Sequence, residues 1–338
     1  MNNPNSTKPA DKKPVAKAWI DVGGTFTDCF VLVGKSDLRS CKVLSSGRVP
    51  ISIETSSQVG TNSNLQSREV RQDTPDFWTG ACLRVLDAEQ TELEHLTVLA
   101  FQPSESGPCH LLLDGQLPEG GSHFELDAGL EAPVLGIHRL LGVPIQEPLP
   151  PLKVRLGTTR GTNALLTRTG ASMVFAVTAP FRDLMTIGDQ TRDDLFALDI
   201  EKPEPLAESV IEIHERLDAD GKVLLELDEE AAAATLKEAF ERGRTSLAIC
   251  LMHSYANPAH EQRIKELAQQ VGFQNISVSS QLAPLIEIIA RAQTTIVDAY
   301  LSPIIRQYLR DLLQQFGGEP NVDLQVMTSA GGMVPWQL

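Results

Sequence analysis

The sequence lacks any long apolar run. None of its 338 residues lies in a stretch that approaches the eighteen or so uninterrupted apolar residues of a membrane-spanning helix. The first fifteen residues, MNNPNSTKPADKKPV, are polar and lack the apolar centre of a secretory signal peptide. We therefore expect a disordered tail over residues 1–16 and a cytoplasmic protein with no membrane association.

Cysteine is also scarce. The chain has five cysteines, an odd number, and no two of them form a C-x-x-C pair. This spacing favours neither a disulfide framework nor a structural zinc site, and we expect reduced thiols. Cys250 and His253 form one C-x-x-H pair, but a single pair without further ligands does not define a metal site.

Positive charge is in short supply. The 29 Lys and Arg residues stand against 44 Asp and Glu residues, so the formal net charge is −15. This balance argues against nucleic acid as a partner, because neutralising phosphates requires clustered Lys and Arg. It does not exclude a nucleotide, which backbone N–H groups and a metal ion can hold.

The apolar pattern indicates how the chain is organised. Residues 17–45 predict the first strands around a Gly-rich turn, and residues 46–127 predict an inserted β-rich subdomain with short alternating runs. From residue 128 helical and strand patterns alternate. Helices are expected at 132–142, 228–243, 258–271 and 287–315, and strands at 172–179, 246–253, 275–280 and 323–330. Such alternation predicts an α/β fold with a largely parallel sheet.

The segment Asp21-Val22-Gly23-Gly24-Thr25-Phe26-Thr27-Asp28 is the most informative one. Two glycines between strands let backbone amides approach an anion closely, and neighbouring Thr hydroxyls add donors. A carboxylate at the end of the first strand can hold a metal ion or its water. The alternative is a β-hairpin that uses Gly-Gly for its geometry alone. The flanking Asp21 and Thr-x-Thr-Asp favour phosphate binding.

A second polar cluster is Gly157-Thr158-Thr159-Arg160-Gly161-Thr162-Asn163, which precedes an apolar helical run. Thr and Asn before a helix provide an anion or carboxylate site at the helix N-terminus. Plain capping of the helix by Thr162 or Asn163 is the alternative. Thr158 and Thr159 are surplus to such a cap, which leaves them for a site.

Two further places carry side chains suited to a site. Arg182, Asp183, Arg192 and Asp194 form a dense mixed-charge segment. These residues either make surface salt bridges or offer a planar guanidinium to a phosphate or carboxylate, and Arg192 is the better candidate for that role. His253 follows an apolar strand, where an open α/β sheet places its ligands.

These motifs occur in an order that resembles the hydantoinase A / 5-oxoprolinase family. The resemblance covers about 17–43 and about 128 to the end. Besides IDVGGTFTD, it rests on GTTRGTNALL at 157–166, on FRD at 181–183 followed by IGDQTR at 187–192 and LF at 195–196, on RAQTT at 291–295 followed by VDAYLSP at 297–303, and on MTSAGG at 327–332. The resemblance implies an actin-like (ribonuclease H-like) ATPase fold.

The resemblance also implies a reaction, in which ATP drives the opening of a cyclic amide, 5-oxoproline or a hydantoin, through phosphorylation of its carbonyl oxygen. On this basis Gly23, Gly24, Thr25 and Thr27 form a phosphate cradle. Asp21 binds Mg²⁺, and Asp28 is either a second carboxylate at the metal or a brace for the turn. Arg192 is a further catalytic candidate. Candidate substrate-binding residues are Thr158, Thr159, Asn163, Arg182 and His253.

Two departures from the family pattern matter. The family's second Asp-Gly-Gly-Thr segment does not occur in this sequence, and the 46–127 insertion has no functional explanation. We therefore expect a truncated chain that is inactive alone, within an oligomer that includes a B-type hydantoinase subunit or fused region. The alternatives are an ATP-dependent ketone carboxylase subunit, an actin-like small-molecule kinase, and a non-enzymatic nucleotide-binding or interaction fragment.

Overall fold

The computed structural model describes residues 16–189 and 203–337. These residues form two compact units. The first contains the residues up to Arg160 and those from Tyr308 onward, and the second contains Gly161–Gln307. The boundary between these two units differs from the boundary predicted between residues 127 and 128, because the first unit also contains residues 128–160. A separate subdomain at 46–127 stays a prediction.

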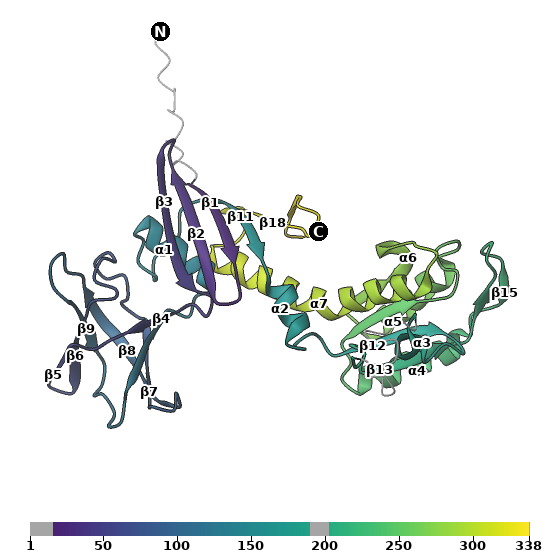
Figure 1. The fold of residues 1–338 in the computed structure, drawn as a ribbon, viewed down its shortest axis with the longest axis horizontal. Helices are drawn as coiled ribbons and strands as arrows, with labels where there is room; N and C mark the ends of the chain where they lie inside the picture. The colour runs from purple at the N-terminus through teal and green to yellow at the C-terminus, as the bar shows by residue number, and fades with distance from the viewer. Residues whose placement is uncertain (1–15, 190–202, 338) are drawn as a thin grey trace, which may run out of the picture. The chain divides into compact units, whose positions relative to one another are not determined.

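The first unit contains a six-stranded mixed sheet (Figure 1), with the order β19-β18-β11-β1-β2-β3. The strands are β1 (Ala16–Val22), β2 (Phe26–Val33), β3 (Asp37–Leu44), β11 (Leu152–Thr158), β18 (Val322–Met327) and β19 (Met333–Pro335). β1 runs parallel to β11, and β11 runs parallel to β18, whereas β2, β3 and β19 are antiparallel to their neighbours. The carboxyl ends of β1, β11 and β18 therefore share one edge of the sheet.

Strict alternation along β1 sets which face of this sheet is buried. Ala18, Ile20 and Val22 are buried, whereas Trp19 and Asp21 are exposed. The buried face packs against helix α1 (Ala132–Leu141), which matches the helix expected at 132–142. The helix ends at Gly142, whose φ of 65° permits the left-handed conformation of a C-cap.

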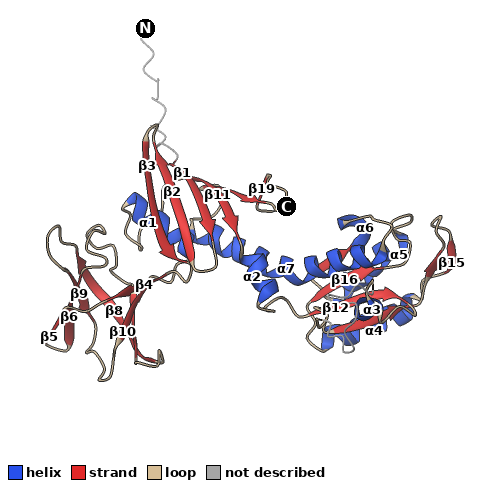
Figure 2. Cartoon of the chain, viewed as in Figure 1, coloured by secondary structure: helices blue, strands red, loops and turns tan. Residues whose placement is uncertain are grey.

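Residues 48–127, all of which the structure describes, contain strands and loops but no helix (Figure 2). The strands are β4 (Arg48–Ile51), β5 (Thr55–Val59), β6 (Asn62–Ser67), β7 (Cys82–Leu86), β8 (Glu92–Gln102), β9 (Cys109–Leu113) and β10 (His123–Asp127). They form one antiparallel sheet in the order β4-β10-β7-β8-β9-β6-β5 around a core that includes Phe77 and Trp78. Asp73 accepts hydrogen bonds from Trp78 Nε1 at 2.8 Å and from Arg139 Nε at 2.9 Å, which ties this core to α1.

The second unit is a three-layer α/β/α arrangement. Its parallel sheet has the order β13-β12-β16-β17, formed by β12 (Met173–Thr178), β13 (Ser209–Ile213), β16 (Ser246–Cys250) and β17 (Asn275–Val278). One face packs on α4 (Glu229–Glu241) and α5 (Ala259–Val271), and the other packs on α7 (Ile288–Gln315), which leaves this unit after Gln307. The remaining elements are α2 (Arg160–Leu166), α3 (Leu184–Ile187), α6 (Ser279–Leu282), β14 (Arg216–Leu217) and β15 (Val223–Leu225).

The predicted helices of this region are confirmed to within two residues, and two predicted strands are shorter than expected. β16 ends at Cys250 rather than at residue 253, because the chain turns there and His253 takes a φ of 58°. β17 ends at Val278, and Ser279 and Ser280 begin the short helix α6 instead of extending the strand. Among the described residues, no helix has the length and apolar character required to cross a bilayer.

Candidate functional site

The Gly-rich segment forms a tight loop between β1 and β2. The Gly23 N–H donates to Phe26 O at 3.0 Å, and a Cβ at Gly23 would lie only 2.9 Å from that oxygen, so the loop requires glycine there. Within the described part of the chain, no backbone oxygen accepts from the N–H of Gly24 or Thr25. These two amides are therefore open to an anion, whereas the Gly23 amide is already bonded to Phe26 O. The predicted binding of phosphate by the loop stays a prediction.

Ser45, which follows β3, braces this loop. Its hydroxyl donates to Gly23 O at 2.8 Å, and its N–H donates to Thr25 O at 2.9 Å. The Thr27 side chain is buried, and its hydroxyl lies 2.9 Å from that of Ser45. Thr27 thus supports the loop from the buried face of the sheet. Its predicted contact with a phosphate stays a prediction.

Asp21 and Asp28 lie directly opposite each other on β1 and β2. Asp28 forms an ion pair with Lys42 at 3.1 Å, which suits the bracing alternative. Asp21 is exposed, and no ion pair or hydrogen bond to its carboxylate occurs among residues 16–189 and 203–337. Gly157 lies opposite it on β11, where a Cβ would come within 3.3 Å of Asp21 Oδ1. The missing side chain leaves this carboxylate accessible.

Thr158 and Thr159 lie beside the loop, because Val22 and Thr158 are register partners at the ends of β1 and β11. The Thr159 N–H and hydroxyl donate to Val22 O at 3.0 and 3.2 Å. Thr158 Oγ1 accepts from the N–H of Arg160, the first residue of α2, at 3.1 Å. The alternative of a cap at Thr162 or Asn163 is not what forms, since both lie inside α2. Thr158, regarded as surplus to such a cap, bonds to the first helical amide.

A third loop completes this edge of the sheet. After β18, the Thr328 N–H donates to Gly332 O at 2.8 Å and the Gly331 N–H donates to Thr328 O at 2.9 Å, with Gly331 at a φ of 83°. This loop corresponds to the MTSAGG motif at 327–332. Three motifs that lie far apart in the sequence thus follow three neighbouring parallel strands, which is where open α/β sheets bind ligands.

The residues at this edge fit a metal-bound nucleotide. Among the described residues, no group of three His, Cys, Asp or Glu side chains could enclose a metal ion by itself. Mg²⁺ does not require one, since proteins commonly hold it by one or two carboxylates together with substrate phosphates and water. The accessible Asp21 carboxylate and the open amides of Gly24 and Thr25 provide such a set.

In the second unit, Arg182 and His253 follow the adjacent strands β12 and β16, so they share the carboxyl edge of the four-stranded sheet. Thr178 Oγ1 accepts from the Met252 N–H at 2.8 Å, which joins the two strand ends. Arg182 is exposed, and His253 is half-buried with Nδ1 3.4 Å from the Tyr255 hydroxyl. Asn163 belongs to this unit on helix α2. Arg192 lies outside the described residues.

A buried polar network lies at this same edge and was missed by sequence reasoning. Thr178 Oγ1 donates to Glu215 Oε1, and His260 Nδ1 lies 2.7 Å from Glu215 Oε2. The Glu261 carboxylate is fully buried and accepts from the N–H of Leu251 at 2.8 Å. No local pattern identifies these residues, because each is a charged or polar residue beside a turn or at a helix start, where exposure is the rule.

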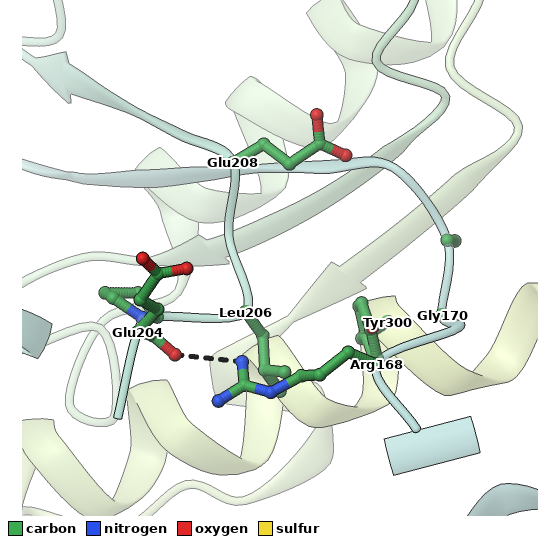
Figure 3. A pocket seen from close by; sticks show the side chains of 8 residues that line it. Arg168, Gly170, Glu204, Leu206, Glu208 and Tyr300 are labelled. Atoms are coloured by element: carbon green, nitrogen blue, oxygen red, sulfur yellow. Dashed lines mark hydrogen bonds between the residues drawn. The ribbon is translucent and has the colours of Figure 1, made fainter. Parts of the chain in front are cut away.

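A cavity of about 380 Å³ lies at the opposite edge of the same sheet, by the amino ends of β12 and β13 (Figure 3). Arg168 lines it and donates to the backbone oxygen of Glu204 at 2.9 Å. Gly170 and Tyr300 also line it, and their packing is close. None of the predicted site residues that the structure describes lines this cavity.

Replacing Gly170 by Ala is expected to destabilise the chain by about 1–3 kcal/mol. The new Cβ would lie 2.0 Å from a ring carbon of Tyr300, which is itself buried on α7. The measurement is the urea midpoint followed by circular dichroism. Gly107→Ala is the control, because a Cβ there meets only the Ser104 hydroxyl at 3.4 Å. Equal midpoints for both variants would contradict the packing at Tyr300.

Comparison with known proteins agrees with this fold. Against solved structures, the chain has a TM-score of 0.56 to a nucleotide-free acetone carboxylase, at 19% identity over 96% of this chain and 38% of that one. It has a TM-score of 0.54 to an ATP-dependent caprolactamase from Pseudomonas jessenii, at 21% identity over 95% of this chain and 36% of that one. At these identities the likeness concerns the fold, a mixed-sheet α/β fold.

The sequence comparisons define the family. Residues 125–272 match the hydantoinase/oxoprolinase N-terminal region, and residues 291–338 match hydantoinase/oxoprolinase. The chain belongs to the hydantoinase/oxoprolinase family. A curated relative, 5-oxoprolinase 1 of Arabidopsis thaliana, is 37% identical over 234 residues, which are 61% of this chain and 18% of that protein. The chain thus spans about a fifth of the length of such relatives.

Proposed function

We propose that this chain forms the nucleotide-binding part of an ATP-dependent enzyme that opens a cyclic amide, 5-oxoproline or a hydantoin. The observation that carries the proposal is the edge of the six-stranded sheet, where Asp21 and the open amides of Gly24 and Thr25 lie together. The family assignment and the 5-oxoprolinase relative support it. Within this proposal the six-stranded sheet is one half of an actin-like ATPase fold.

The residues of the loop would hold the phosphates of the nucleotide. The N–H groups of Gly24 and Thr25, with the Thr25 hydroxyl, would donate to phosphate oxygens, and Asp21 would hold Mg²⁺. The metal ion would supply positive charge against the negative charge of phosphoryl transfer. Ser45 fixes the loop, so its amides need no reorganisation. Thr27 contributes through its contact with Ser45.

The chemical logic of the reaction is carbonyl activation. An amide carbonyl is a poor electrophile, and transfer of a phosphoryl group to its oxygen makes the carbon open to attack by water. Thr158 and Thr159, beside Val22 at the end of β1, are the substrate candidates of the first unit. Arg182, His253 and Asn163 are the candidates of the second unit, and Arg192 stays a catalytic candidate from the sequence alone.

The whole protein's partners and substrate are part of the same proposal. We propose that activity requires a B-type hydantoinase subunit or fused region within an oligomer. An ATP-dependent ketone carboxylase subunit is the second candidate, favoured by the structural likeness to an acetone carboxylase. Both reactions begin with phosphorylation of a substrate oxygen, a carbonyl or an enolate, so the residues around the phosphates serve either.

The deciding experiment is ATP-dependent conversion of 5-oxoproline to glutamate by the uninterrupted parent polypeptide with a B-type partner. Glutamate formed in step with ADP would support the ring-opening assignment. ADP release with hydantoins, or with a ketone and bicarbonate, would move the substrate and keep the phosphate loop. A stable phosphate ester as product would indicate a small-molecule kinase. Absence of ATP turnover with every substrate would leave a non-enzymatic nucleotide-binding or interaction role.

A further inference from the structure

Two of the five cysteines lie opposite each other in the six-stranded sheet. Cys29 on β2 and Cys41 on β3 are direct register partners across an antiparallel pair of strands. Such partners have Cα atoms about 4.5–5.5 Å apart, within the range of about 4.4–6.8 Å that a disulfide spans. The backbone therefore needs no rearrangement to join them.

Both sulfurs also point the same way, toward Gly136 of α1. A Cβ built on Gly136 would lie 2.5 Å from Cys29 Sγ and 3.5 Å from Cys41 Sγ. In its thiol form Cys41 donates to Gly136 O at 3.5 Å. Because this helical position lacks a side chain, the space between helix and strands accommodates both sulfurs.

The two thiols differ in the way that a reactive pair requires. Cys29 is fully buried, and its contact with Cys41, together with burial, raises its thiol pKa. Cys41 is half-buried on β3, the edge strand of the sheet. A hydrogen bond from Cys29 lowers the pKa of Cys41 against the effect of burial, and the Arg139 charge lowers it further, while Asp73 and Asp28 oppose this. Cys41 is thus the more readily ionised and the more accessible of the two.

The other three cysteines have no such partner. Cys82 lies opposite Thr97 and Asp127, Cys109 opposite Ser67, and Cys250 opposite Val177. Burial raises the thiol pKa of each. Only the Cys29–Cys41 pair combines an accessible nucleophile with a second thiol in contact, the arrangement typical of redox-responsive cysteines.

We propose that Cys29 and Cys41 form a reversible redox pair that closes to a cross-strand disulfide on reaction with a hydroperoxide. The Cys41 thiolate attacks a peroxide oxygen, so that an S–O bond forms, the O–O bond breaks and the alcohol or water leaves with a proton. The Cys29 sulfur then attacks the Cys41 sulfur, the S–O bond breaks, and water leaves with the Cys29 proton. Two thiols lose two electrons, and the hydroperoxide gains them.

The test treats the reduced, desalted chain with hydrogen peroxide, followed by thiol titration and tryptic mass spectrometry without reductant. We expect two of the five thiols to disappear, and peptide 18–35 to become linked to peptide 40–42. Dithiothreitol should restore all five. The proposal would be overturned if the linked peptide occurred only in a species of twice the chain mass, which indicates a disulfide between two chains. It would also be overturned if any other thiol were oxidised first, or if all five thiols survived the treatment.

Single variants separate the two sulfurs. Cys29→Ser should give no linked peptide and leave a sulfenic acid on Cys41 that dimedone traps in peptide 40–42. Cys41→Ser should keep its four thiols under the same treatment. Cys82→Ser is the matched control, since Cys82 is also half-buried on a strand, and it should form the disulfide as the parent does. A dimedone adduct at Cys29 in Cys41→Ser, formed as fast as that at Cys41 in Cys29→Ser, would contradict the assigned roles.

Discussion

Replacing Asp21 by Asn in the complete polypeptide is expected to lower ATP turnover by roughly 10²–10³-fold while leaving the fold unchanged. The residue is exposed at the end of β1, so the amide can replace the carboxylate without repacking. The substitution would remove the negative charge that holds Mg²⁺ beside the phosphates. The measurement is ADP release at saturating MgATP, with the thermal midpoint compared between the two proteins.

Two other carboxylates in the same sheet serve as comparisons. Asp323→Asn is the control, because Asp323 lies on β18 and pairs with Arg155 at 3.2 Å, away from the loop. Asp28→Asn should reduce turnover less than Asp21→Asn, since Asp28 is already paired with Lys42. Unchanged turnover in Asp21→Asn would reject the metal assignment. An equal loss in Asp28→Asn would make both carboxylates ligands rather than a ligand and a brace.

Replacing Glu261 by Ala is expected to destabilise the chain by at least about 3 kcal/mol, because three donors lose their acceptor at about 1–3 kcal/mol each. The donors are the Leu251 N–H at 2.8 Å, the Ser279 hydroxyl at 2.6 Å and the Ser280 N–H at 2.9 Å. The carboxylate thereby joins the ends of β16 and β17 to α5. The measurement is the free energy of unfolding from urea denaturation of the chain.

Glu266→Ala is the matched control on the same helix. Its carboxylate is exposed and pairs with Arg263 at 2.8 Å, an arrangement worth about 0–1 kcal/mol. If Glu261→Ala lowered the free energy of unfolding no more than Glu266→Ala does, the buried contacts of Glu261 would contribute no net stability. Both variants remove one negative charge from α5, so the difference between them reports burial and hydrogen bonding rather than net charge.

Local patterns were sufficient for much of the second unit. The expected helices at 228–243, 258–271 and 287–315 correspond to α4, α5 and α7, because an apolar stripe of helical period depends only on residues within a few turns. The strand ends were less predictable. β16 stops at Cys250 because the chain turns and His253 adopts a left-handed conformation. The residue types in that segment do not predict this turn.

The candidate site shows the same limit. The two glycines and Asp21 could be singled out from the sequence, since Asp21 and the Thr-x-Thr-Asp segment on either side distinguish this Gly-Gly turn from a plain hairpin. The place of Thr158 beside Val22 could not, because it depends on a register between strands more than a hundred residues apart. The buried Glu215, His260 and Glu261 were missed because their acceptors and donors come from other strands and helices.

By itself, then, the sequence determined the family, the anionic character of the chain, the α/β alternation and the position of the Gly-rich loop. These properties follow from composition and from residues near one another in the chain. Only the tertiary structure decided that β1, β11 and β18 bring three distant motifs to one edge, and that Cys29 faces Cys41 across two strands. The physical reason is that strand pairing fixes register between distant segments, whereas local patterns specify only the elements that pair.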